Sequence, residues 1–137
     1  MTLRPPLLPL GLAAMLVVCA TARAEDLAGS EWRPVRIGTA EVAPAAKAFV
    51  QFKAGGELAG HGGCNRFFGR YQTAGEAIEI GGLGATRMAC PAPIMAVEAE
   101  IFAALEAART WQRDRTSLVL FDGAKRELAR LQQTDAD

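Results

Sequence analysis

The residues of this chain that could do chemistry lie in one short stretch, GHGGCNRFFGRY at positions 60–71. His61 and Cys64 are three residues apart on a glycine-rich backbone, so their side chains could touch. A neighbouring histidine can lower the pKa of a thiol and make it nucleophilic. The first interpretation is therefore a thiol enzyme that uses Cys64 as nucleophile and His61, the chain's single histidine, as base. No third group that would orient the imidazole is evident.

Two other interpretations compete for the same stretch. Together with Cys90, these residues supply three metal ligands, whereas a structural zinc site has four at recognisable spacings. In the third interpretation Cys64 and Cys90 form a disulfide, Gly63 bends the backbone, and Asn65 bonds neighbouring backbone groups. A disulfide that encloses about 27 residues stabilises a fold by about 3–4 kcal/mol. We favour this structural interpretation, and we expect no catalytic residue, no metal and no cofactor.

The compartment predicted from the N-terminus agrees with a disulfide. Residues 1–24 have a basic start, an apolar run and the sequence ARA before a cut after Ala24, which together indicate a secretory signal. The expected location is periplasmic or secreted, where disulfides persist. The alternative is a lipoprotein anchored through Cys19, although bulky Val18 stands where a small residue is usual.

Charge and length narrow the possible functions further. Without the two arginines of the predicted signal, 13 basic residues face 15 acidic ones, and no basic block occurs. Nucleic acid is therefore an unlikely type of partner. We expect one domain over residues 25–132 and a flexible tail over 133–137.

The elements that must position these residues are mostly strands. Period-two apolar patterns bounded by turn residues predict about seven or eight of them. Gly69 is expected at a β-bulge, and Asp122–Gly123 at a hairpin. The predicted strands are 31–37, 49–52, 57–63, 65–73, 76–83, one around Trp111, 117–121, and one through Leu128 and Leu131.

One helix interrupts the strands. Between Cys90 and Thr110 the pattern changes to helical spacing. The acidic residues Glu98, Glu100 and Glu106 precede Arg109, as suits a helix dipole. The expected fold is mainly β (α+β): a small antiparallel, partly open β-barrel with one amphipathic helix before the last strands, and a cavity at its mouth. The predicted buried stripe of the helix is Ile94, Val97, Ile101, Leu105 and Ala108.

Four further side chains have two possible uses. Arg87 could hold loop carbonyls over the barrel mouth or bind a ligand. Phe67, Phe68 and Tyr71 cannot all face one side of a regular strand, so at least one should be outside or at a bulge.

Two motifs resemble those of the META domain, or HslJ-like, family. The first, G-C-N-x-x-x-G-x-Y, matches Gly63, Cys64, Asn65, Gly69 and Tyr71. The second, T-R-M-x-C-P, matches Thr86, Arg87, Met88, Cys90 and Pro91. The resemblance extends from about Leu27 to Leu131.

The resemblance implies a small, partly open β-barrel with one helix, a Cys64–Cys90 pair and no established catalytic activity. Members are exported or envelope-bound, and are linked to heat-shock response, novobiocin resistance, motility and virulence. The fold also resembles pilot lipoproteins that bind lipid in a cracked barrel. We therefore expect a non-enzymatic envelope protein that binds a small apolar ligand, lipid or peptide or acts in envelope stress. The alternatives are an interaction module that pairs through an exposed strand edge with an envelope partner, and the thiol enzyme.

Overall fold

The computed structural model describes residues 1–7, 11 and 26–134. The predicted signal cleavage after Ala24 and the alternative anchor Cys19 lie outside the described residues.

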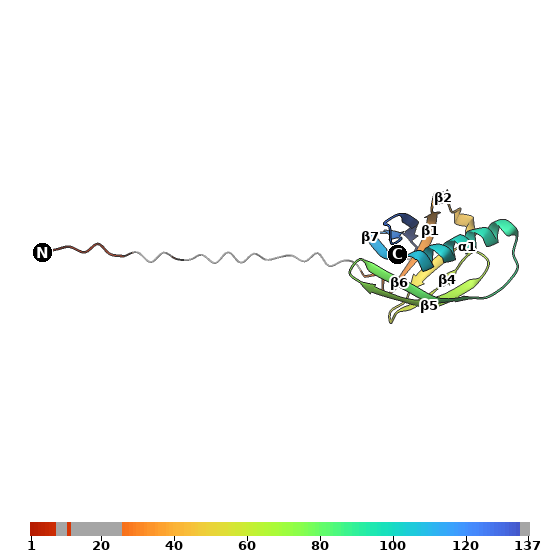
Figure 1. Cartoon of the computed structure of the whole chain (residues 1–137), viewed down its shortest axis with the longest axis horizontal. Helices are drawn as coiled ribbons and strands as arrows, with labels where there is room; N and C mark the ends of the chain where they lie inside the picture. The colour runs from red at the N-terminus through yellow and green to blue at the C-terminus, as the bar shows by residue number, and fades with distance from the viewer. Residues whose placement is uncertain (8–10, 12–25, 135–137) are drawn as a thin grey trace.

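The described domain is one antiparallel sheet with one α-helix (Figure 1). The chain runs almost wholly as a meander, because most strands pair with the next one in sequence. A short 3-10 helix (Pro44–Ala46) precedes the third strand. The elements are β1 (Ser30–Ile37), β2 (Ala40–Glu41), β3 (Phe49–Phe52), β4 (Glu57–His61), β5 (Arg66–Ala74), β6 (Ala77–Ala85), α1 (Ala92–Ala107), β7 (Thr110–Asp114), β8 (Ser117–Phe121) and β9 (Glu127–Gln133).

The sheet curls into a partly closed ring. Strand β1 pairs with β3 along its first half and with β9 along most of its length, so the two ends of the meander meet. On the far side, β6 and β7 share a single paired position, Ala77 with Thr110. The prediction of a mainly β, partly open antiparallel fold with one helix before the last strands is confirmed. Strand edges in the described residues are confined to β2 and to the seam between β6 and β7.

Two boundaries differ from the sequence prediction. Strand β2 lies in a region predicted as loop, because Gly38, at φ 57°, turns the chain tightly enough for Ala40 to pair with Ile37. The predicted flexible tail, residues 133–137, overlaps the end of β9 (Glu127–Gln133) by one residue. Gln133 pairs with Trp32, and the backbone nitrogen of Thr134 donates to the carbonyl of Glu31.

The inside of the ring is filled by side chains. Alternate residues of each strand point inward, so the largest inward side chains meet at the centre and exclude water. The ring therefore encloses a packed hydrophobic core, and the cavity expected at a barrel mouth does not extend into it. The largest fully buried side chains include Trp32, Phe52, Phe67, Leu58, Leu118 and Leu120.

Helix α1 packs on this core through only part of the predicted stripe. Ile101 and Leu105 are buried, and Ala108 is buried just after the helix ends. Ile94 was predicted to be buried, but its side chain is 40% exposed. The first turn of α1 projects at one end of the molecule (Figure 1), where no strand covers it. Glu98 takes the buried position one turn further along.

Candidate functional site

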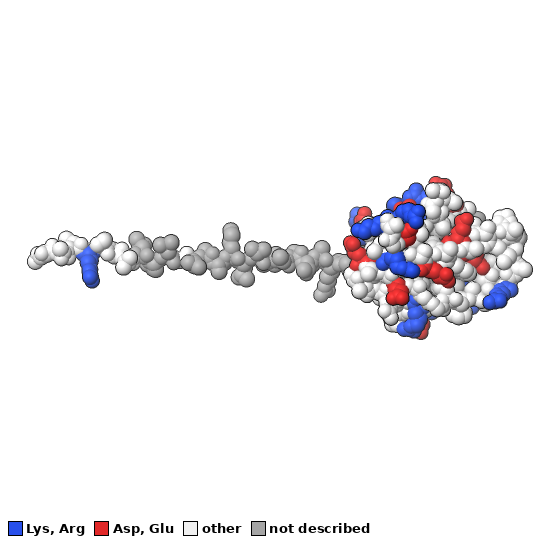
Figure 2. All heavy atoms as spheres, viewed as in Figure 1, with Lys and Arg blue, Asp and Glu red and all other residues white. Residues whose placement is uncertain are grey.

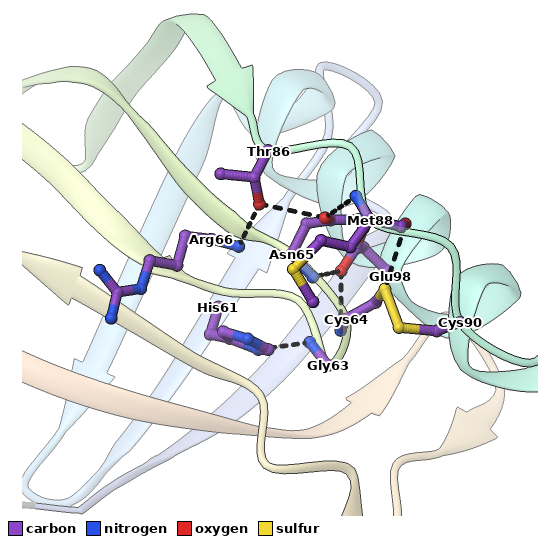
Figure 3. The surroundings of a disulfide bond; sticks show 9 residues. All are labelled: His61, Gly63, Cys64, Asn65, Arg66, Thr86, Met88, Cys90 and Glu98. Atoms are coloured by element: carbon purple, nitrogen blue, oxygen red, sulfur yellow. Dashed lines mark hydrogen bonds between the residues drawn. A yellow bond between two sulfur atoms is a disulfide. The ribbon is translucent and has the colours of Figure 1, made fainter.

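The predicted disulfide is present and joins two segments that are distant in sequence. Cys64, in the bend after β4, is bonded to Cys90, just before α1, across a sequence separation of 26 residues. Their Cα atoms are 6.0 Å apart, within the usual range for disulfides. Cys64 is buried at 4% exposure. The bond fastens the glycine-rich bend to the start of the helix (Figure 3).

Asn65 connects the same two segments through hydrogen bonds. Its Oδ1 accepts from the backbone nitrogen of Met88 at 2.6 Å and from Oγ1 of Thr86 at 3.0 Å. Its Nδ2 donates to the carbonyl of Met88 at 3.3 Å and to Oε1 of Glu98 at 2.8 Å. An amide group has two donor hydrogens and two acceptor lone pairs, and all four are used. Asparagine is therefore required at position 65, because no other side chain places two donor hydrogens and two acceptor lone pairs at these positions.

Glu98 completes the network from the helix side. Its Oε2 accepts from the backbone nitrogens of Cys64 at 2.9 Å and Asn65 at 2.6 Å. Burial by itself raises the pKa of the Glu98 carboxyl. The hydrogen bonds from Asn65 and Cys64, with a smaller contribution from His61, outweigh that effect and hold the pKa below its ordinary value. The carboxylate is consequently an internal anion that caps the backbone of the bend.

Two glycines make room for this carboxylate. A Cβ on Gly62 would lie 2.5 Å from Cγ and 2.8 Å from Oε2 of Glu98, closer than real side-chain contacts allow. Gly63 has φ 112°, a conformation that L-residues rarely adopt. The glycine pair before Cys64 therefore brings the backbone within reach of the helix and turns it.

The proposed catalytic pair is not assembled in this structure. The Cys64 sulfur is committed to the disulfide, so it has no thiolate. The backbone nitrogen of Gly63 donates to Nδ1 of His61 at 3.0 Å. The imidazole stacks against the ring of Phe49, with centroids 6.4 Å apart. His61 thus has structural partners of its own, Gly63 and Phe49, which are distinct from Cys64.

The remaining residues of the first motif shape β5. The register of β5 against β6 shifts between Phe68 and Arg70, which places Gly69 at the predicted bulge. A Cβ on Gly69 would lie 2.9 Å from the carbonyl oxygen of Gly81. Tyr71 is buried and donates from its hydroxyl to the carbonyl of Lys53 at 2.7 Å.

The aromatic residues divide as the strand geometry requires. Phe67 and Tyr71 face the core, and their rings contact Phe102 and Phe52 edge-on. Phe68 points outward and is 58% exposed. The expectation that at least one of the three would lie outside is confirmed.

The second motif forms the loop that faces the bend. Thr86 donates to Asn65 and accepts from the backbone nitrogen of Arg66 at 3.2 Å. Arg87 is exposed, and within residues 26–134 its side chain makes no hydrogen bond or ion pair. In this loop the carbonyl of Met88 accepts from Asn65, so the predicted use of Arg87 in holding loop carbonyls is not seen in the described residues.

A shallow hollow lies beside this loop. It has a volume of about 530 Å³ and opens between the end of β6, the loop and α1. Its apolar lining comes chiefly from Leu83, Ala85, Met88, Met95 and Phe102. Asn65 and Glu98 also border it, but their polar atoms are already bonded to each other and to backbone. The hollow therefore offers apolar contact more than polar recognition.

Two kinds of feature are absent from the part of the chain that the structure describes. No group of three or more His, Cys, Asp or Glu residues there is placed to hold a metal ion. No described helix has the length and apolarity to span a membrane.

The family model described as META domain matches residues 25–135. The chain belongs to the META domain family. Within this META domain, the two motifs are the two sides of one cross-linked bend: G-C-N supplies the turn, and T-R-M-x-C-P supplies the loop bonded to it. No curated protein sequence matches the chain.

Solved structures resemble this META domain in fold. A protein from Burkholderia xenovorans, solved by NMR, is 23% identical with a TM-score of 0.64, and the match covers 80% of this chain and 84% of that one. A DUF4847 family protein from Bacteroides vulgatus, solved by crystallography, is 18% identical with a TM-score of 0.61, covering 81% of this chain and 96% of that one. At these identities the likeness concerns the fold alone.

The residue that sequence reasoning missed is Glu98. It was read as one of three acidic residues ahead of Arg109, whereas it is buried at 5% exposure. A signal was present: Glu98 is four residues after Ile94 and three before Ile101, which places it on the apolar stripe. A carboxylate at such a position needs a partner inside the fold.

Proposed function

We propose that this META domain is an exported, non-enzymatic binding protein of the cell envelope. It holds a small apolar ligand, a lipid chain or an apolar peptide in the hollow beside the loop of residues 86–91, which we call the disulfide loop. The observation that carries the proposal is the position of that hollow. It lies where the sheet is least closed, between β6 and α1, and its lining is mostly apolar, with Asn65, Thr86, Arg87 and Glu98 as its polar residues. Ligand sites of this kind are concave, mostly apolar and largely pre-formed.

The packing of the interior favours this place over the centre of the ring. Side chains such as Trp32, Phe52 and Leu118 are fully buried and leave the ring filled. A ligand that entered the core would have to displace them, whereas the hollow is open in the unliganded domain. The loop that borders the hollow is held by Asn65 and the disulfide, so a ligand would meet a pre-organised surface.

The chemistry of the bend supports a binding role without catalysis. The oxidised Cys64 offers no nucleophile, and the Glu98 carboxylate is buried and already accepts three hydrogen bonds inside the fold. A general base needs a free lone pair within reach of substrate. The disulfide is also compatible with the oxidising compartment in which an exported protein works.

The test is a pair of alanine-to-leucine variants. Ala85 lines the hollow, and Ala85→Leu fills part of it. Ala103 lines a different hollow, on the other side of α1, so Ala103→Leu adds the same three carbon atoms elsewhere. Binding of a soluble short-chain fatty acid is followed by NMR shifts of the oxidised protein, and native mass spectrometry reports any ligand that co-purifies.

We expect the fatty acid to shift resonances of Leu83, Met88 and Phe102, and Ala85→Leu to weaken its binding at least tenfold. Ala103→Leu should bind as the unmodified protein does. The proposal fails if the shifts map elsewhere, or if both variants bind equally well.

A further inference from the structure

The exposed apolar side chains of the domain gather at one end. Between Asp26 and Thr134 the exposed large hydrophobic residues are Phe68, Met88, Ile94 and Met95, with exposures of 58, 60, 40 and 42%. We call these four residues the apolar tip. They come from β5, the disulfide loop and the first turn of α1, so only the folded chain brings them to one end.

Contacts around the bend link the residues of the apolar tip to two glycines of the bend and of β6. Ile94 Cγ2 lies 3.5 Å from the position that a Cβ on Gly63 would occupy. Met88 and Met95 border the same hollow as Gly84. The ring of Phe68 covers Gly84, since a Cβ there would lie 2.7 Å from Phe68 Cε2.

The surface around the tip has few charges. The segment from Met88 to Val97, MACPAPIMAV, contains no charged residue, and most of it is exposed. In the space-filling view, the end of the molecule where α1 begins is almost entirely white (Figure 2). Elsewhere in that view, blue and red side chains alternate.

The charges that do border the tip have one sign. The chain contains no Asp or Glu in residues 42–49, 61–68 or 83–97, which contain the apolar tip and its neighbours, yet these segments contain Lys47, Arg66 and Arg87. Lys47, Arg66 and Arg87 are exposed, and no ion pair within residues 26–134 neutralises them. The Glu98 carboxylate, which lies beside the bend, is buried and bonded to it.

Lys47 belongs to this border through the 3-10 helix. It follows Ala46, whose carbonyl oxygen lies 3.3 Å from the position of a Cβ on Gly63, the glycine that also faces Ile94. Arg66 begins β5, and its backbone nitrogen donates to Thr86, the neighbour of Arg87. The three cations therefore surround the same bend as the apolar tip.

An apolar tip bordered only by cations is complementary to an anionic lipid surface. Methionine and phenylalanine side chains enter the boundary between headgroups and acyl chains, and each lysine or arginine near the surface adds attraction to anionic lipid. We propose that this end of the domain docks on a bilayer that contains anionic phospholipid. This inference goes beyond the proposed function, because its occupant is a bilayer rather than a ligand in the hollow, although Met88 and Met95 belong to both surfaces.

The test measures how the oxidised exported protein, as purified, partitions onto vesicles. Vesicles of phosphatidylcholine with 30 mol% phosphatidylglycerol are compared with vesicles of phosphatidylcholine alone by co-sedimentation. The protein is expected on the anionic vesicles, with binding that weakens as salt is raised. A double variant, Lys47→Glu with Arg66→Glu, should bind at least about 25-fold more weakly, since each cation near the surface contributes about fivefold.

Further variants separate the contributions. Phe68→Ser with Ile94→Ser should lower binding while leaving the cations in place, and neither residue lines the hollow. Arg115→Glu is the matched charge control, because Arg115 is exposed in the β7–β8 turn, away from the bend. Its binding should stay within about twofold of the unmodified protein.

The proposal is overturned if the protein stays in the supernatant with anionic vesicles, if it binds both vesicle types equally, or if Arg115→Glu reduces binding as much as the double variant. Absence of vesicle binding would assign the tip to a protein partner instead. The hollow variant Ala85→Leu should bind vesicles normally, and the variant with Lys47→Glu and Arg66→Glu should still bind fatty acid. Each proposal can therefore fail without the other.

Discussion

Replacing Glu98 by glutamine tests whether the buried carboxylate holds the bend. Glutamine keeps the shape and one oxygen, which can still accept from the backbone nitrogens of Cys64 and Asn65. Its amide nitrogen, however, faces Nδ2 of Asn65, so two donors oppose each other. Asn65 cannot rotate to relieve this, because its oxygen is needed by the backbone nitrogen of Met88.

The expected loss of stability follows from the three hydrogen bonds that the Glu98 carboxylate accepts. Loss of one buried bond with its donor left unsatisfied costs about 1–3 kcal/mol, and the two bonds that remain lose their charge assistance, about 1 kcal/mol each. Burial of a neutral amide in place of a charge offsets part of this cost. We expect the free energy of unfolding to fall by about 3 kcal/mol, which lowers the Tm by about 10 °C.

The pKa of Glu98 predicts how the stability difference between the unmodified protein and Glu98→Gln changes with pH. The folded pKa of Glu98 lies below its ordinary value of 4.5. The stabilisation by the ionised carboxylate is therefore fully present above about pH 4.5 and is lost as the pH falls through the folded pKa. The stability difference between the unmodified protein and Glu98→Gln should be greatest near neutral pH and should shrink in acid.

The assay is urea unfolding of the oxidised protein, followed by fluorescence from pH 7 down to pH 3. Glu100→Gln is the matched control, because Glu100 is exposed on the same helix. It should change stability by less than about 0.5 kcal/mol. Equal stability of the two variants at pH 7, or a loss in Glu98→Gln that does not diminish in acid, would refute the role assigned to Glu98.

Two other predictions concern the same framework. Replacing Cys64 and Cys90 together by serine should lower the free energy of unfolding by about 3–4 kcal/mol, because the unfolded chain regains the conformational freedom that the closed loop removes. A reduced protein that unfolds at the same urea concentration as the oxidised protein would contradict this prediction. Tyr71→Phe removes the hydrogen bond to the carbonyl of Lys53 and should cost about 1 kcal/mol. Burial, with a smaller effect of Asp26, raises the pKa of Tyr71 above 10.0, so its stabilisation is present below pH 10 and is lost as the pH rises through the folded pKa. Tyr71 is the chain's one tyrosine, so the ultraviolet absorbance of tyrosinate titrates it directly, and an ordinary value would contradict its burial.

Much of the fold could be predicted from local pattern. The alternation of Ile78, Glu79 and Ile80 requires a strand with one buried face, and the structure buries both isoleucines. The Gly69 bulge and the outward turn of Phe68 follow from the geometry of a pleated strand. Features that depended on distant neighbours were less predictable. The two-residue strand β2 forms because β1 lies alongside it, and Ile94 is exposed because no strand reaches the first turn of α1.

The sequence alone determined the chemistry that this chain can use: two cysteines able to pair, glycines able to turn the backbone, and a helix with one apolar face. These are properties of residues and of their near neighbours, and they persist in any arrangement of the elements. The tertiary structure decided which groups meet. Only folding brings the Glu98 carboxylate of α1 to the backbone of Cys64 and Asn65, 34 and 33 residues earlier. Only folding gathers Phe68, Met88, Ile94 and Met95 beside three cations, because their closeness depends on long-range pairing that no local pattern contains.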